Sequence, residues 1–160
     1  IVAYMTEKIA PAPGEKILEI GTGSGYQAAV LAELGADVYS IEILPELADH
    51  ARAVLKAEGY GKVQVLTGDG YKGWPANAPF DVIIVTCAPD KIPQALVDQL
   101  KEGGRMILPL DTGIQQLVVL RKKDGKVEKS EDLLVRFVPM VHGKDPDPAR
   151  TNAPPAPRKE

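Results

Sequence analysis

The chain has 160 residues, of which 44% are hydrophobic and 26% charged, with a formal net charge of −3. This length supports one domain with one sizeable core and is too short for two. The charge gives no reason to expect nucleic acid or an anionic membrane as partner, and no apolar run approaches the roughly 18 residues of a membrane span. Cys87 is the only cysteine and cannot form an internal disulfide, which is consistent with a cytoplasmic location.

Strand and helix patterns alternate along most of the chain. Short apolar runs predict buried strands, and runs rich in Ala, Leu and charged residues predict the helices between them. Breaks fall at clusters of Pro and Gly, as at residues 11–14. The expected strands are residues 16–20, 37–42, 62–67, 81–86 and 105–110, and the expected helices are residues 1–10, 26–34, 45–58 and 93–100.

The pattern changes after residue 110. Residues 115–122 and 133–140 are strand-like, and residues 123–126, with Asp124-Gly125, predict the hairpin that joins them. The expected fold is therefore α/β: a doubly wound, mostly parallel, Rossmann-like sheet with a C-terminal antiparallel hairpin. We expect one domain over residues 1–142 and a Pro-rich, mobile tail over residues 143–160.

A glycine-rich turn follows the first expected strand. Gly21, Gly23 and Gly25 alternate with other residues before the next helix. Three alternating glycines exceed what a tight turn needs, and they let a ligand lie against the backbone. A dinucleotide fingerprint would need glycine where Tyr26 stands, and a P-loop would need a following Gly-Lys-Ser/Thr. The remaining candidate is an adenosine ligand without phosphates, such as S-adenosylmethionine.

Two carboxylates fit that ligand at the ends of the next two strands. Glu42 could accept hydrogen bonds from both ribose hydroxyls, and Asp69, within Gly68-Asp69-Gly70, from an adenine amino group. Each signal has a rival explanation: the 21-residue spacing from Gly21 to Glu42 would also suit NAD, and a Gly-Asp-Gly turn is common for structural reasons. Together with the glycines, however, they favour S-adenosylmethionine.

Other reactive residues give weaker signals. No histidine stands near Cys87 in the sequence to activate it, so a small strand-end residue is the better interpretation. His50 and His142 are isolated and lack ligand spacing, so we expect no metal site. Tyr71 and Trp74 are candidates to cover the adenine, although such aromatic residues more often anchor a loop.

Several further stretches of the chain match a known family: residues 18–31, 38–42, 68–70, 78–81, 83–86, 92–93, 95–100, 103–105 and 137–140. In these stretches the chain closely resembles protein-L-isoaspartate O-methyltransferases. The resemblance implies methyl transfer from S-adenosylmethionine to the free carboxylate of an L-isoaspartyl or D-aspartyl residue, in proteins or peptides, as a repair reaction. It implies no metal, nucleic acid or membrane as partner.

The resemblance also implies which residues form the site. The glycines would line the methionine part of the cofactor, Glu42 would hold the ribose, and Asp69 the adenine edge. The cofactor-binding residues would be Glu19, Gly21, Thr22, Gly23, Gly25, Glu42, Ile43, Asp69 and Gly70. The substrate-binding residues would be Val2, Ala88, Pro89 and Val141.

The catalytic residue is left unassigned. Family members carry a segment of the form Gln-Thr-Ile-Ser-x-Pro just before the stretch that matches residues 1–3, and its serine is regarded as the active-site residue. That segment lies upstream of Ile1, where the printed sequence begins, so we expect an N-terminally truncated member of the family. Two alternatives stay open: a methyltransferase of a small molecule, and a cofactor-binding remnant with little activity.

Overall fold

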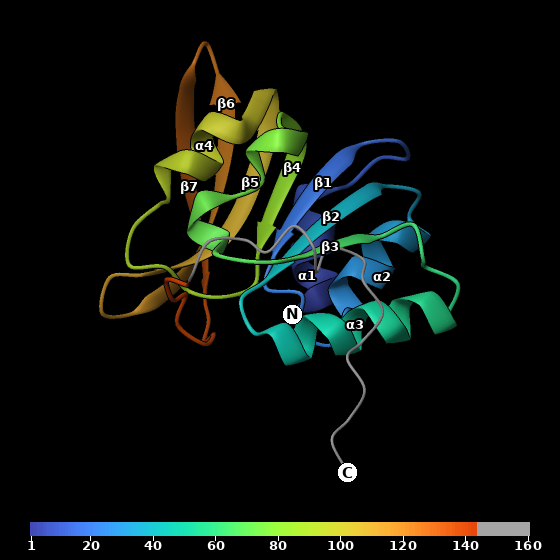
Figure 1. Ribbon diagram of the computed structural model, residues 1–160. Helices are drawn as coiled ribbons and strands as arrows, with labels where there is room; N and C mark the ends of the chain where they lie inside the picture. Colours follow the sequence, from blue (N-terminus) through green and yellow to red (C-terminus); the bar gives the residue numbers. More distant parts are fainter. Residues whose placement is uncertain (144–160) are drawn as a thin grey trace.

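A seven-stranded sheet in the order β3-β2-β1-β4-β5-β6-β7 forms the centre of the computed structural model, which describes residues 1–143 (Figure 1). Strands β1 to β5 run parallel, and β6 and β7 add antiparallel at one edge. The strands are β1 (Lys16–Ile20), β2 (Asp37–Glu42), β3 (Gln64–Thr67), β4 (Phe80–Val85), β5 (Leu100–Asp111), β6 (Gln115–Lys123) and β7 (Lys126–Leu134). This arrangement confirms the predicted fold class.

Helices cover both faces of the sheet. They are α1 (Val2–Ile9), α2 (Tyr26–Glu33), α3 (Pro45–Ala57) and α4 (Gln94–Gln99), with short 3-10 turns η1 (Gly70–Lys72) and η2 (Pro75–Asn77). Neighbouring residues of β1 point to opposite faces: Ile17 packs in a core cluster with α1, α2 and α3, and Leu18 in a second cluster with α4. Figure 1 shows α4 on the side of the sheet opposite these three helices. The sheet is therefore doubly wound.

Helix α1 is shorter by one residue at each end than the helix predicted for residues 1–10. Ile1 lies just before it as the N-cap, 60% exposed, and its carbonyl accepts from the backbone N–H of Met5 (2.9 Å). The Ile1 side chain is apolar and forms no cap hydrogen bond. Ala10 leaves the helix in a left-handed conformation (φ 41°), because the following Pro11 disfavours a helical backbone at the residue before it.

The chain changes direction across the sheet beside β1. From β1 it moves outward to β2 and β3, and it then returns to β4 on the other side of β1. Parallel strands that diverge in this way leave a crevice at their carboxyl ends, where ligands bind in open α/β sheets. The glycine-rich turn and both predicted carboxylates lie at this edge.

The C-terminal hairpin is confirmed, but one of its strands was misplaced. Asp124 (φ 52°) and Gly125 (φ 72°) form the turn, in the left-handed conformation typical of tight hairpins. The strand predicted for residues 133–140 is wrong, because β7 ends at Leu134. Strand β7 lies at the sheet edge with both faces largely exposed, so it carries charged residues rather than an alternating apolar pattern. Residues 135–143 instead cross the carboxyl edge, where only Pro139 forms a bridge, to Ala88.

Strand β5 also begins earlier than predicted. Phe80 pairs with Leu100 and Val82 with Arg105, so residues 101–104 form a bulge in the strand. Helix α4 accordingly ends at Gln99, before the Gly103-Gly104 pair that was expected to end it. The predicted Pro-rich tail, apart from Gly143, lies outside the described residues.

Candidate cofactor site

The glycine-rich turn forms a loop between β1 and α2 in which the backbone is left-handed at alternate residues. The φ angles are 97° at Gly21, 53° at Gly23 and 85° at Gly25. A Cβ atom on Gly23 would meet no atom of the described chain within 4 Å, so this part of the loop faces open space. The loop therefore presents bare backbone at the carboxyl edge.

Thr86, just past β4, holds one side of this loop. Its Oγ1 donates to the carbonyl oxygens of Ile20 (3.0 Å) and Gly21 (2.8 Å), and its backbone N–H donates to Ile20 (2.9 Å). A Cβ on Gly21 would lie 2.5 Å from Thr86 Oγ1. Glycine is thus required at position 21 by close approach as well as by its positive φ.

Glu42, at the end of β2, holds the other side. Its side chain is buried; Oε2 accepts from the backbone N–H of Gly23 (2.9 Å) and Oε1 from that of Leu44 (3.0 Å). A carboxylate offers about four lone-pair sites, so each oxygen keeps one for a further donor. The side chain predicted to hold a ribose also orders the loop.

A buried polar chain lies beneath the loop. Thr22 Oγ1 and Ser40 Oγ are 2.5 Å apart, and Ser40 Oγ donates in turn to Glu19 Oε2. Glu19 is fully buried, and burial raises its pKa from 4.5 to about 8, the Ser40 hydrogen bond opposing the shift and the Glu42 charge adding to it. Among the described residues, two buried side-chain nitrogen or oxygen atoms have no hydrogen-bond partner: Glu19 Oε1 and Gln27 Oε1.

The predicted adenine-binding residues lie together at the ends of β2 and β3. Asp69 is 3% exposed, and its Oδ1 accepts from the backbone N–H of Tyr71 (2.9 Å), which lies in η1. Gly70 is buried, and Ile43 is half-buried directly after Glu42. Gly143 reaches this group, because a Cβ on it would lie 2.8 Å from the Ile43 side chain.

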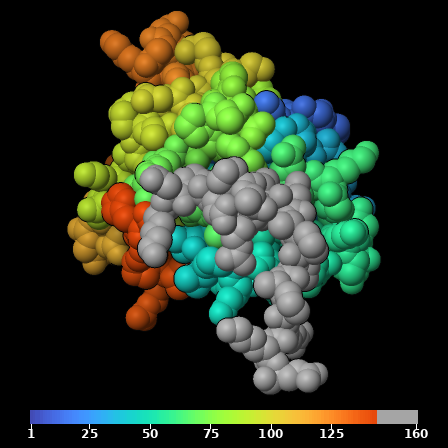
Figure 2. Space-filling view, viewed as in Figure 1, coloured from blue at the N-terminus to red at the C-terminus, as the bar shows by residue number. Residues whose placement is uncertain are grey.

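The predicted substrate residues fall in different places. Ala88 and Pro89 are buried, and the backbone of Ala88 is hydrogen-bonded to those of Met140 and Val138, both at 2.8 Å. Val141 is 53% exposed on this same crossing segment, and Figure 2 shows the end of the described chain, in red, on the surface. Val2 is half-buried at the start of α1. Val141 thus follows directly after Met140, whose backbone is bonded to Ala88.

Ile1 lies in front of α1 with its side chain exposed, and an aliphatic group supplies neither a nucleophile nor an acid or base. The catalytic residue therefore stays unassigned.

The weaker candidates are accounted for by packing. Cys87 is half-buried, and this burial raises the pKa of its thiol to about 12, which disfavours the reactive thiolate. Trp74 packs edge-on against Tyr39 in the core, so it anchors its loop and does not cover a ligand. His50 is exposed on α3. Within residues 1–143, no three His, Cys, Asp or Glu side chains gather as a metal site would require, and no helix is long and apolar enough to cross a membrane.

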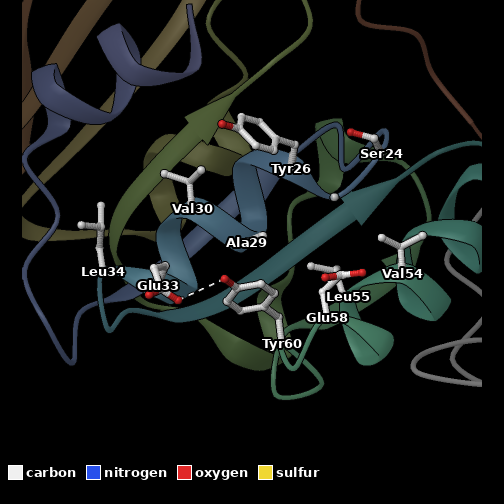
Figure 3. A pocket seen from close by; sticks show the side chains of 11 residues that line it. Ser24, Tyr26, Ala29, Val30, Glu33, Leu34, Val54, Leu55, Glu58 and Tyr60 are labelled. Atoms are coloured by element: carbon white, nitrogen blue, oxygen red, sulfur yellow. Dashed lines mark hydrogen bonds between the residues drawn. The ribbon is translucent and has the colours of Figure 1, made fainter.

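A hollow of about 530 Å³ lies outside this edge, between α2 and α3. Figure 3 shows Ser24 and Tyr26 at one end and the hydrogen-bonded pair Tyr60 and Glu33 (3.0 Å) at the other. Its walls are mostly apolar, and Gly25 is the one predicted cofactor residue among those that line it. The convergent polar groups lie instead at the carboxyl edge, which is therefore the candidate cofactor site.

Ser40, Thr86 and His142 belong to this edge although the sequence did not single them out for it. Ser40 lies within an apolar strand and Thr86 directly follows one. A polar residue in such a place is a sequence signal by which both could have been predicted as site residues. His142 lies beside Asp69, and no local pattern marks it. These residues can be assigned to the candidate site only when it is known which strands are neighbours.

The fold and the glycine loop define the class of Rossmann-like S-adenosylmethionine-dependent methyltransferases, and solved structures agree. A protein-L-isoaspartate O-methyltransferase superposes with a TM-score of 0.82 at 34% identity, over 86% of this chain and 45% of that one. A protein from Plasmodium falciparum, solved in complex with S-adenosyl-L-homocysteine, gives 0.72 at 23% identity, over 88% and 71% of the two chains. The latter likeness shows the fold alone.

The sequence comparisons then identify the family. Residues 1–145 match the family described as protein-L-isoaspartate(D-aspartate) O-methyltransferase (PCMT), and the chain belongs to it. It is 54% identical over 146 residues to a protein-L-isoaspartate O-methyltransferase of Gloeobacter violaceus, covering 90% of this chain and 71% of that one. An enzyme of the same name from a Picosynechococcus strain is 50% identical over 140 residues, covering 88% and 63%. The chain thus spans about two thirds of the length of these relatives.

Proposed function

We propose that this chain binds S-adenosylmethionine at the carboxyl edge of its sheet and serves methyl transfer to the free carboxylate of L-isoaspartyl or D-aspartyl residues in damaged proteins. The observation that carries the proposal is the loop held between Glu42 and Thr86, with Asp69 at the next strand end. Family membership supplies the substrate class. The named relatives are enzymes of this reaction.

The residues present fit such a cofactor. The open space at Gly23 leaves room for a ligand against the loop backbone. The Glu42 carboxylate keeps a lone pair on each oxygen, which matches the two hydroxyls of a ribose. Asp69 Oδ2 has His142 Nδ1 at 3.4 Å and keeps a second lone pair that can accept from an amino group. We propose the cofactor roles of Glu19, Gly21, Thr22, Gly25, Ile43 and Gly70 on the same grounds, and those of Val2, Ala88, Pro89 and Val141 toward the substrate.

For this methyl transfer the protein has mainly to bind and orient the two reactants. The bound cofactor supplies an electrophilic methyl group on a sulfonium. A peptide carboxyl group with a pKa of roughly 3.3–3.7 is already ionised at neutral pH, so the chain needs no general base. Glu42, Asp69 and the loop backbone would fix the cofactor, and the rest of the site would align the carboxylate and exclude water. Alignment of this kind can lower a barrier by roughly 7–11 kcal/mol.

Two measurements test the proposal. Calorimetric titration should show binding of S-adenosyl-L-homocysteine and none of NAD; binding of NAD alone would contradict the cofactor. Methyl transfer should then be compared on paired peptides that differ only in isoaspartate against aspartate. Equal rates on the two peptides would remove isoaspartate as the substrate and favour a small-molecule methyltransferase. Cofactor binding with no transfer to either peptide would favour a cofactor-binding remnant.

We also propose a cytoplasmic location, which is consistent with Cys87 being the only cysteine in the sequence. Fractionation of the native host cells, with an antibody to the chain, tests it.

A further inference from the structure

The segment after β7 reaches the adenine end of the proposed site and is fixed there. Met140 donates its backbone N–H to Ala88 (2.8 Å), and the Tyr71 hydroxyl donates to the Met140 carbonyl (3.3 Å). Met140 is buried, and its Cε would lie 3.1 Å from a Cβ on Gly70. These contacts hold the backbone two residues before His142 and limit where its side chain can lie.

His142 lies between Tyr71 and Asp69. Its ring stacks on that of Tyr71, with centroids 4.0 Å apart and planes inclined by 19°. Its Nδ1 is 3.4 Å from Asp69 Oδ2, the oxygen that Tyr71 N–H does not occupy. The Asp69 side chain is 4% exposed and that of His142 is 76% exposed. Asp69 therefore forms the floor of the adenine end, and His142 forms its rim.

We propose that His142 is a positioning residue that gives the site its specificity for the 6-amino group of adenine. Its ring stacks on Tyr71, and its Nδ1 restrains the orientation of the Asp69 carboxylate, which accepts from that amino group. The inference rests on the proposed function, since it concerns the same cofactor. The Tyr71 N–H at Oδ1 and the His142 ring at Oδ2 together restrict rotation of the Asp69 carboxylate. A site built to hydrogen-bond an NH group rejects an analogue that lacks it far more strongly than an apolar pocket could.

The segment after β7 lines the proposed site and does not occupy the space of the cofactor. A segment that occupied the cofactor's place would have to move when the cofactor binds, and this movement would break the Met140–Ala88 and Tyr71–Met140 hydrogen bonds. The outer face of His142 is open, so the imidazole can keep its place at the rim with the nucleoside bound beside it.

The test compares two ligands by calorimetry: S-adenosyl-L-homocysteine and its inosine analogue, in which an oxo group replaces the 6-amino group. The wild-type chain should prefer the adenosine ligand. His142→Ala should weaken binding of that ligand by about tenfold, the loss expected for one hydrogen bond to a charged group, and leave the analogue nearly unchanged. The discrimination ratio should therefore fall. His50→Ala, on the exposed face of α3, is the matched control and should behave as wild type.

Two further variants separate the ring from the nitrogen. His142→Asn keeps a donor near Asp69 without the stack and should restore the discrimination ratio, whereas His142→Phe keeps the stack without the donor and should not. The inference is overturned if every variant retains the wild-type ratio, or if His142→Ala binds the adenosine ligand more tightly, which would make the segment a competitor. An equal loss for both ligands with a lower melting temperature would show a purely structural role and overturn it as well. A wild-type chain that binds neither ligand contradicts the proposed function itself.

Discussion

The carboxylate of Glu42 accepts a hydrogen bond of 2.9 Å from the backbone N–H of Gly23, so the end of β2 fixes the loop that follows β1. Strands β1 and β2 are neighbours in register, with Ile20 opposite Ile41. The group expected to bind the ribose and the loop expected to receive the methionine part are therefore one structural unit. A change in either is expected to affect both.

We predict that Glu42→Ala weakens binding of S-adenosyl-L-homocysteine by roughly 1.5–3 kcal/mol, because hydrogen bonds to a charged acceptor are lost. Glu42→Gln should lose less, since its amide oxygen can still accept from one N–H. Calorimetric titration measures both, with Glu46→Ala, an exposed acid in the first turn of α3, as control. Unchanged affinity in Glu42→Ala would show that the ribose role is wrong.

We predict opposite consequences for two alanine substitutions in the loop. Gly21→Ala should chiefly lower stability, because its Cβ would lie 2.5 Å from Thr86 Oγ1 at a φ of 97°. Gly23→Ala should cost only about 1–2 kcal/mol of left-handed strain but should reduce cofactor affinity, because its methyl enters the open space of the site.

Thermal unfolding and calorimetric titration on the same samples check this contrast. Gly125→Ala, at a left-handed position of the β6–β7 turn with open surroundings, is the control for strain alone. If Gly23→Ala binds the cofactor as tightly as Gly125→Ala does, the space beside Gly23 is not part of the site.

We predict that the stability of the ligand-free chain falls with rising pH because of Glu19. Its pKa is 4.5 in an ordinary environment and about 8 when buried in the folded chain. Below pH about 4.5 both folded and unfolded states carry the proton; between about 4.5 and 8 only the folded state keeps it. The free energy of unfolding should therefore decrease through this window, by up to about 1.4 kcal/mol per pH unit, and level off above it.

Urea titrations at intervals from about pH 5 to about pH 9 would measure this slope. Glu19→Gln, which is neutral at every pH, should remove Glu19's part of it while keeping an acceptor for Ser40. The same slope in wild type and variant would mean that Glu19 is ionised in the folded chain.

We predict that this chain methylates isoaspartyl peptides more slowly than a version extended upstream of Ile1 by a Gln-Thr-Ile-Ser-x-Pro segment. The reaction depends on alignment, and a misplacement of about 1 Å can reduce a rate on the order of a hundredfold. A methyl-transfer assay with both proteins at matched concentration decides it. Equal rates would show that the segment is dispensable for this chain.

The sequence by itself determined the element order and the chemistry of the loop. Alternation of buried strands and helices left few topologies, and the glycine spacing with Tyr26 excluded a dinucleotide fingerprint. Asp124-Gly125 located the hairpin because a two-residue turn needs left-handed backbone at both positions, which is a local requirement. Such features depend on only a few neighbouring residues, so they can be predicted from the sequence without knowledge of the fold.

Only the tertiary structure decided what crosses the carboxyl edge. Residues 135–140 alternate like a strand, yet they leave the sheet because the stretch packs on Ala88 and Tyr71, far away in the sequence. The same holds for Ser40 beneath Thr22, Thr86 against Gly21, and His142 over Asp69. Each of these contacts joins segments that are far apart in the sequence, and their formation depends on which strands are neighbours and on how the side chains pack. A local sequence pattern specifies neither the order of the strands in the sheet nor the packing of their side chains.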